Sequence, residues 1–127
     1  MEEEQKKTIL IVDDEAAVRK PLADELQFQG FSVLEAVNGK EGLRLALEKK
    51  PDLILLDIAM PEMTGLEVIR ELRKDAWGKR ARIIFITQLP ADDAILKEIV
   101  SSEPSYYLMK SDWTIDDIMR KIKETLG

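Results

Sequence analysis

Side chains that could bind a cation and a phosphoryl group follow four short apolar segments of this sequence. The set consists of Asp13 and Asp14, Asp57, Thr87 and Lys110. Carboxylates are the hard oxygen ligands that Mg²⁺ prefers, and the ion usually completes its shell with water and phosphate oxygens. A lysine adds a compact positive charge and a threonine adds a hydroxyl donor. If the fold gathers these residues, the sequence predicts a crevice that receives a phosphoryl group.

The elements that must position these residues are visible as five apolar runs. Each run is nearly continuous rather than alternating, which is typical of strands covered on both faces. The stretches between them have helical spacing, as at Leu66, Ile69 and Leu72. The least regular helix is expected at about 91–100, whereas the last one begins at Thr114 with Asp117 as a capping partner. The predicted strands are 9–12, 31–34, 53–56, 83–86 and 106–109.

Five β-α units predict a doubly wound α/β fold with a five-stranded parallel sheet and helices on both faces. In the flavodoxin-like order 2-1-3-4-5, ligands bind at the carboxyl edge, between the first and third strands. Asp13, Asp14 and Asp57 should flank that point. Because carboxylates in one crevice repel each other, they either take up protons or share a divalent cation, and we favour Mg²⁺.

Composition limits the class of protein. The 127 residues predict one domain over 1–127, with residues 1–6 as a disordered N-terminal extension. A hydrophobic fraction of 45% is enough for a core, and a net charge of −6 without a basic stripe disfavours nucleic acid and anionic membranes as partners. The sequence has no span-length apolar run and no signal-peptide pattern, so we expect a cytoplasmic protein.

The chain contains no cysteine and no histidine. This excludes disulfides, thiol catalysis, a Ser-His-Asp triad and a Cys/His zinc site. Any chemistry must therefore depend on carboxylates, hydroxyls and amines. A phosphohistidine, if one is involved, must belong to another protein.

Together these residues resemble the receiver domain of bacterial response regulators, the CheY-like domain of two-component signalling. The resemblance extends from about Lys7 to Leu126. It is carried by Asp13-Asp14, by Asp57-Ile-Ala-Met-Pro-Glu-Met-Thr-Gly65, and by Thr87 and Lys110. Each feature alone also has an ordinary explanation as a turn, a helix cap or a strand end. Their joint occurrence at four strand ends favours the site.

The resemblance implies a phosphoacceptor. Asp57 would accept a phosphoryl group from the phosphohistidine of a histidine kinase or a histidine phosphotransfer protein. Mg²⁺ would be bound by Asp14, Asp57 and the backbone carbonyl of Ala59, with Asp13 acting mostly through water. Lys110 would contact the phosphoryl group.

The resemblance also implies a conformational switch. Thr87 would move toward the phosphoryl group and Tyr107 would change its rotamer, altering the face made by the fourth helix, fifth strand and fifth helix. A downstream protein effector would read this face, and the domain would be a monomer or a phosphorylation-dependent dimer. Such a domain is regulatory rather than a turnover enzyme, apart from its own phosphoryl transfer and slow autodephosphorylation.

Three departures from the family pattern change the expectations. Ser111 stands where the family usually has proline in a cis peptide bond, so either the bond is trans and the loop from Lys110 to Thr114 is rebuilt, or packing around Trp113 offsets the strain. Gln88 is larger than the small residue that the family commonly has after its threonine, so it is expected to shield the phosphoryl group and to slow its transfer and loss. Ala59 and Leu89 lack polar side chains that could orient a hydrolytic water, which predicts a long-lived acyl phosphate.

Two other functions compete with the switch. A Mg²⁺-dependent aspartyl-phosphate hydrolase would need Glu15 or Glu62 as a general acid. A degenerate receiver that only docks to partners is the other alternative. Ser111 and Gln88 make it conceivable, whereas the presence of Asp14, Asp57 and Thr87 weighs against it. Nucleotide or flavin binding is poorly supported, because the first strand does not lead into a glycine-rich loop.

Overall fold

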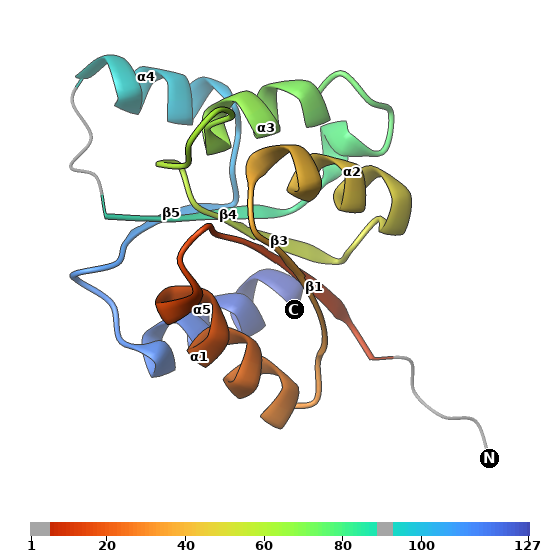
Figure 1. Ribbon diagram of the computed structural model, residues 1–127, viewed down its shortest axis with the longest axis vertical. Helices are drawn as coiled ribbons and strands as arrows, with labels where there is room; N and C mark the ends of the chain where they lie inside the picture. The colour runs from red at the N-terminus through yellow and green to blue at the C-terminus, as the bar shows by residue number, and fades with distance from the viewer. Residues whose placement is uncertain (1–5, 89–92) are drawn as a thin grey trace.

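A parallel five-stranded sheet forms the middle layer of the molecule (Figure 1). The computed structural model describes residues 6–88 and 93–127. The strand order β2-β1-β3-β4-β5 confirms the predicted topology. The expected extension over 1–6 falls almost entirely outside the described residues and stays a prediction. The strands are β1 (Thr8–Val12), β2 (Ser32–Ala36), β3 (Leu53–Leu56), β4 (Ile83–Thr87) and β5 (Tyr106–Met109).

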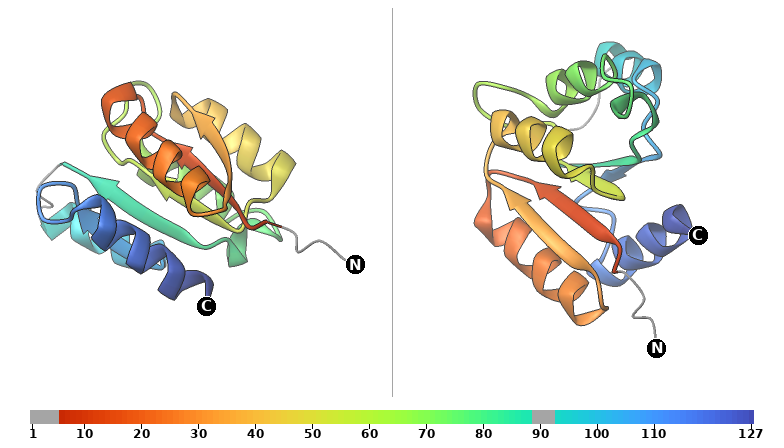
Figure 2. Two further views of the ribbon diagram at one scale, coloured as in Figure 1. Left: turned by 90° about the horizontal axis from the view of Figure 1, so that it is seen from below. Right: turned by 90° about the vertical axis from the view of Figure 1, so that its right-hand side faces the viewer.

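Helices cover both faces of the sheet, α1 and α5 on one side and α2, α3 and α4 on the other (Figure 2). The described part of α4 begins at Asp93, so the predicted helix start at 91 lies outside the described residues. A short 3₁₀ turn, Gly78–Arg80, precedes β4. The helices are α1 (Ala16–Phe28), α2 (Gly39–Lys49), α3 (Gly65–Leu72), α4 (Asp93–Ser101) and α5 (Ile115–Leu126).

Each face of the sheet carries its own hydrophobic core. Side chains of one strand alternate between the faces, so that Leu10 and Val12 pack under α2 and α3 while Ile9 and Ile11 pack under α1 and α5. The central strands β1, β3 and β4 are covered on both sides, as predicted. That prediction was wrong for the edge strands, where Ser32 of β2 and Tyr106 of β5 are exposed. An edge strand has a neighbour on one side only.

Capping side chains explain where several helices begin. Thr64 and Glu67 form a capping box at the start of α3, and Thr114 and Asp117 form the predicted one at α5. Asn38 caps α2 by accepting from the backbone amide of Glu41. The first helix differs, because its N-cap residue makes no side-chain capping bond. The start of α1 therefore depends on other contacts.

Candidate functional site

The register of the central strands places the two key aspartates side by side. Val12 of β1 is paired with Leu56 of β3, so the residues that follow, Asp13 and Asp57, emerge next to each other at the carboxyl edge. The amide of Asp57 also donates to the carbonyl of Val12 at 3.0 Å. Both aspartates are buried, at 4% and 3% exposure. The expected meeting of the first and third strand ends is therefore present.

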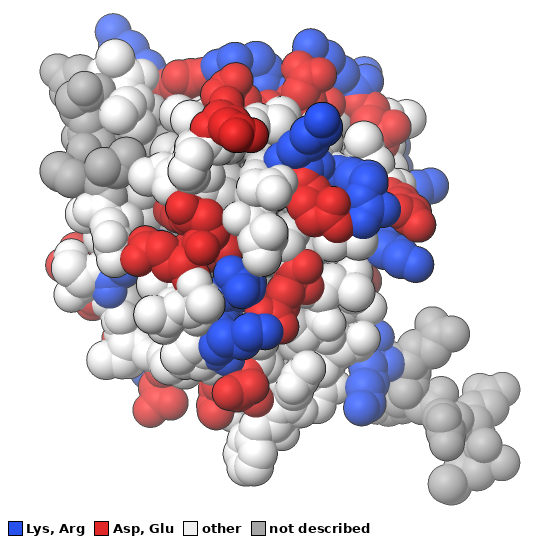
Figure 3. Space-filling model, viewed as in Figure 1, with Lys and Arg blue, Asp and Glu red and all other residues white. Residues whose placement is uncertain are grey.

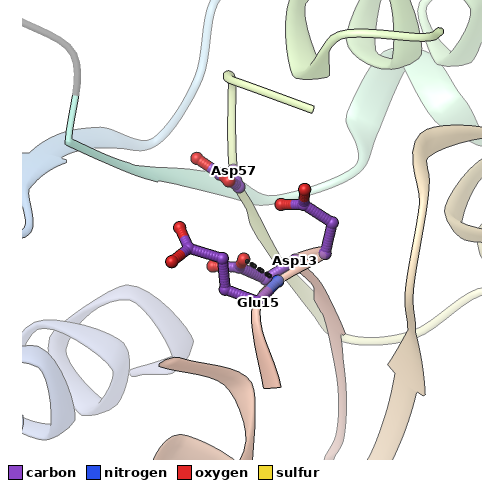
Figure 4. A group of neighbouring side chains, drawn as sticks. Asp13, Glu15 and Asp57 are labelled. Carbon is purple, nitrogen blue, oxygen red and sulfur yellow. Dashed lines mark hydrogen bonds between the residues drawn. The ribbon is translucent and has the colours of Figure 1, made fainter. Parts of the chain in front are cut away.

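Four carboxylates gather at this edge (Figure 4). One oxygen from each of them lies within 4.8 Å of the others, and the residues are Asp13, Asp14, Glu15 and Asp57. Asp14 and Glu15 are exposed, so the cluster opens to solvent. Acidic side chains accordingly form a patch left of centre on the face in Figure 3. The sequence reasoning considered Glu15 only as a general acid and missed its place in the cluster.

Lys110 reaches into the acidic cluster from the end of β5. Its Nζ lies 3.0 Å from Oδ2 of Asp13 and 3.7 Å from Oδ2 of Asp57. Its backbone amide donates to the carbonyl of Thr87 at 2.8 Å, which ties the lysine to β4. The described residues contain no cis peptide bond, so the Lys110–Ser111 bond is trans. The lysine thus enters the crevice without the family's proline.

Both carboxylate oxygens of Asp13 have partners within the protein. Besides its ion pair with Lys110, its Oδ1 accepts the backbone amide of Glu15 at 2.9 Å, the dashed line in Figure 4. Its own carbonyl accepts from Arg19 at 2.8 Å. Asp13 is therefore a fixed partner of the loop and of Lys110.

The surroundings of Asp57 disfavour the charged form of its carboxyl group. Burial raises its pKa to about 6, and the charges of Asp13 and Asp14 act in the same direction. Lys110 and the backbone amide of Ala59 oppose that rise without cancelling it. Within the described part of the chain, Oδ1 of Asp57 is buried and accepts no hydrogen bond. An acceptor left without a donor beside other carboxylates suits a hard cation such as Mg²⁺.

This raised pKa predicts how the metal-free protein responds to pH. A carboxyl whose pKa is about 6 when folded and near 3.8 when unfolded destabilises the folded state above pH 6. In EDTA, Asp57→Asn should raise the free energy of unfolding by about 3 kcal/mol at about pH 8. The gain should shrink as the pH falls through 6 toward 4. Urea unfolding across this pH range measures it.

Added Mg²⁺ provides the companion measurement. It should stabilise the wild type at about pH 8 more than Asp57→Asn, because the ion offsets the repulsion that the variant has already lost. A variant that is less stable than the wild type in EDTA, or a difference that does not change with pH, would contradict the electrostatic account.

Thr87 and Tyr107 lie on the same side of the sheet. Thr87 ends β4 and is fully buried. Tyr107 is half-buried against the core under α3 and α4, and its hydroxyl donates to the sulfur of Met109 at 3.1 Å. Tyr106 points to the other face, where Lys121 lies 4.1 Å from its ring centre. Tyr107 is therefore the tyrosine that shares a face with Thr87.

Gly65 makes a close backbone approach that was not predicted from the sequence. Its amide donates to the carbonyl of Ile58 at 3.0 Å, which closes the loop after Asp57. A Cβ at this position would overlap the carbonyl oxygen of Asp57 and lie 2.9 Å from Cα of Ile58. The spacing between Asp57 and the Thr64 cap is the only sequence signal for this approach.

The remaining predicted positions surround this centre. Ala59 is exposed two residues after Asp57, and Glu62 is exposed in the same loop with a φ of 68°. Gln88 is exposed beyond Thr87, while Leu89 lies outside the described residues.

Over residues 6–88 and 93–127, no helix combines the length and the apolar character needed to cross a membrane.

Comparison with known proteins agrees with this geometry. The family model of the response regulator receiver domain matches residues 9–123. The response regulator MprA of Mycolicibacterium vanbaalenii is 49% identical over 93% of this chain and 49% of its own length. The chemotaxis protein CheY of Thermotoga maritima is 38% identical over 72% of this chain and 85% of its own length.

A solved structure shows the same fold. The CheY-like receiver domain protein of Methanospirillum hungatei superposes with a TM-score of 0.88 at 30% identity, covering 96% of this chain and 94% of that one. The chain spans about half the length or less of several curated relatives that it matches.

Proposed function

The chain belongs to the response regulator receiver domain family of two-component signalling, and on this premise we propose that Asp57 is its phosphoacceptor. Phosphorylation-dependent switching is the general function of the family, which is regulatory and not a classical enzyme family. One observation carries the assignment to Asp57: its buried Oδ1 accepts no hydrogen bond within the described chain, beside three further carboxylates and a lysine.

The proposed step is an exchange of one phosphorus bond for another. A carboxylate oxygen of Asp57 attacks the phosphorus of a phosphohistidine, and the P–N bond breaks with its electron pair returning to the imidazole nitrogen. The product is an acyl phosphate on Asp57. The proposed donor is a histidine kinase or a histidine phosphotransfer protein, and its phosphohistidine lies outside these 127 residues, which contain no histidine.

The acidic cluster fits Mg²⁺ in the chemistry of its donors. Asp13, Asp14, Asp57 and the carbonyl of Ala59 would hold the ion, which when bound neutralises charge on the phosphoryl oxygens and on the carboxylates. Lys110, now paired with Asp13, is close enough to Asp57 to exchange one anionic partner for the phosphoryl group. The charge of that group is then balanced from two sides.

The switch would pass from β4 to β5. Thr87 donates its hydroxyl to the phosphoryl group, and Tyr107, on the same face, changes rotamer to fill the space it leaves. The α4-β5-α5 face thereby alters, and a protein effector or a second copy of the domain reads it. Two states within a few kcal/mol of each other suffice, provided that the phosphoryl group contacts one better.

The test is incubation of the chain with Mg²⁺ and acetyl phosphate, followed by mass spectrometry and measurement of donor consumption. The switch predicts an adduct of one phosphoryl group that outlasts the removal of donor. Continuous consumption without an adduct would indicate the hydrolase. No adduct, together with no binding of beryllofluoride, would indicate a docking module and overturn the proposal.

A further inference from the structure

A buried arginine lies next to the site and has no part in the proposed chemistry. Among the described residues, the buried polar or charged side chains are Asp13, Arg19, Asp57 and Thr87. Three of these belong to the site. The fourth, Arg19 of α1, is only 7% exposed. A buried guanidinium costs free energy unless its donors are matched, so its contacts should reveal what it does.

Arg19 connects three parts of the fold. Its Nη1 donates to the carbonyl of Asp13 at 2.8 Å, and its Nε donates to Oε1 of Glu35 in β2 at 2.9 Å. Glu35 is itself fixed, because its strand pairs with β1 at Ile11. The rigid fork of a guanidinium can hold two acceptors in different directions at once, which an ammonium does less well. The arginine therefore anchors the acidic loop to the sheet.

Besides Arg19, the acidic loop is held at Asp13, whose amide donates to the carbonyl of Ala36 at 3.2 Å and whose carboxylate pairs with Lys110 at 3.0 Å. Its carboxylates repel one another, which favours opening of the cluster. The start of α1 does not fix the loop through a side-chain cap, because Glu15 at its N-cap makes no capping bond. The N-cap residues of α2, α3 and α5 do make such bonds. The contact from Arg19 reaches the backbone of the residue at which the cluster begins.

We infer that Arg19 is a positioning residue that holds residues 13–15 in the conformation that gathers their carboxylates beside Asp57, and so sets the affinity for a divalent cation. The inference rests on the proposed function, because it assumes that this cluster holds the ion. A purely structural arginine would tie α1 to β2 without affecting the cluster. The two roles differ in what metal binding should do when the arginine is changed.

The experiment measures Mn²⁺ binding by the electron paramagnetic resonance signal of the free ion, at a temperature where every variant is folded. Arg19→Met should weaken Mn²⁺ binding about 10-fold or more, in the range found for residues that orient metal ligands. Arg19→Lys should recover part of the loss, because one ammonium can reach one of the two acceptors. If Arg19→Met does not fold, Arg19→Lys carries the test with a smaller loss.

Lys20→Met is the matched control. Lys20 is the next residue along the helix, and its ammonium lies 3.1 Å from the same carboxylate of Glu35, but it is exposed and its partner is Glu35 rather than the carbonyl of Asp13. This variant should bind Mn²⁺ like the wild type. Phosphorylation of Arg19→Met by acetyl phosphate should be slow at limiting Mg²⁺ and approach the wild-type rate at saturating Mg²⁺, since the defect is in binding the ion.

Two results would overturn the inference, and they are distinguishable. If both Arg19 variants melt at lower temperature but bind Mn²⁺ with wild-type affinity, Arg19 is only structural and the proposed function stands. If Asp14→Asn binds Mn²⁺ as the wild type does, the cluster is not the metal site, and the proposed function fails together with the inference.

Discussion

Asp57→Asn should slow phosphorylation by acetyl phosphate and Mg²⁺ by at least ~1,000-fold, the size of effect seen when a nucleophile is removed. The amide has nearly the shape of the carboxylate and can occupy the same buried position. Its oxygen is a far weaker nucleophile, and no neighbouring carboxylate occupies the place of Asp57 at the end of β3. The measurement is the fraction of protein carrying one phosphoryl group over time.

Glu62→Gln provides the comparison for this variant. Glu62 is a carboxylate of the same loop, but it is exposed and lies outside the acidic cluster of Asp13, Asp14, Glu15 and Asp57. Its loss should leave the rate of phosphorylation near the wild-type value. An adduct that forms on Asp57→Asn at the wild-type rate would show that another residue is the acceptor. A slow reaction in Glu62→Gln alone would favour the hydrolase, in which a glutamate is the general acid.

The strand-end residues were predictable because parallel register converts sequence position into spatial position. Apolar runs identified β1 and β3, and the residues after them had to meet at one edge. The same reasoning identified β4 and β5 and hence Thr87 and Lys110. It needed no knowledge of side-chain contacts, since the backbone pairing alone brings these positions together.

Contacts with backbone carbonyls were not predictable in this way. Arg19 is one of two basic residues on the predicted first helix, and nothing in its spacing indicates that it reaches the carbonyl of Asp13. Arg73 is similar, since its guanidinium donates to the carbonyls of Gly78, Ala81, Ser102 and Glu103, which belong to two distant turns. Every residue has a carbonyl, so the sequence holds no sign of which ones a guanidinium selects.

The departure at Ser111 shows a related limit. Proline at that position is one means of directing the lysine, and with serine there the sequence left the orientation of Lys110 open. In the structure the lysine is directed by the hydrogen bond that its backbone amide donates to the carbonyl of Thr87 and by the ion pair with Asp13. Thr87 is the last residue of β4 and Asp13 directly follows β1, and both strands were predicted from the sequence. The site is thus held by the sheet more than by the loop after β5.

Gly65→Ala should be the most damaging conservative change in the loop that follows Asp57. The new methyl would overlap the carbonyl oxygen of Asp57, and backbone atoms cannot turn aside as a side chain does. The free energy of unfolding should fall by about 3 kcal/mol, the upper part of the range for overpacking. Because Asp57 itself must shift, phosphorylation of the folded variant should slow by roughly 100-fold.

Thr64→Ala separates this effect from the loss of the adjoining helix cap. Thr64 caps α3 through the amide of Glu67 at 3.2 Å, and removing such a cap costs about 1 kcal/mol. This control should unfold somewhat earlier in urea while Asp57 reacts at nearly the wild-type rate, since the Asp57 carbonyl is undisturbed. If Gly65→Ala matched Thr64→Ala in both stability and rate, the close approach of Gly65 to Asp57 would have no part in holding the phosphoacceptor. A rate loss in Gly65→Ala that exceeds its loss of folded protein would instead assign the glycine to the geometry of the site, because unfolding alone lowers the amount of active protein and not the rate of each folded molecule.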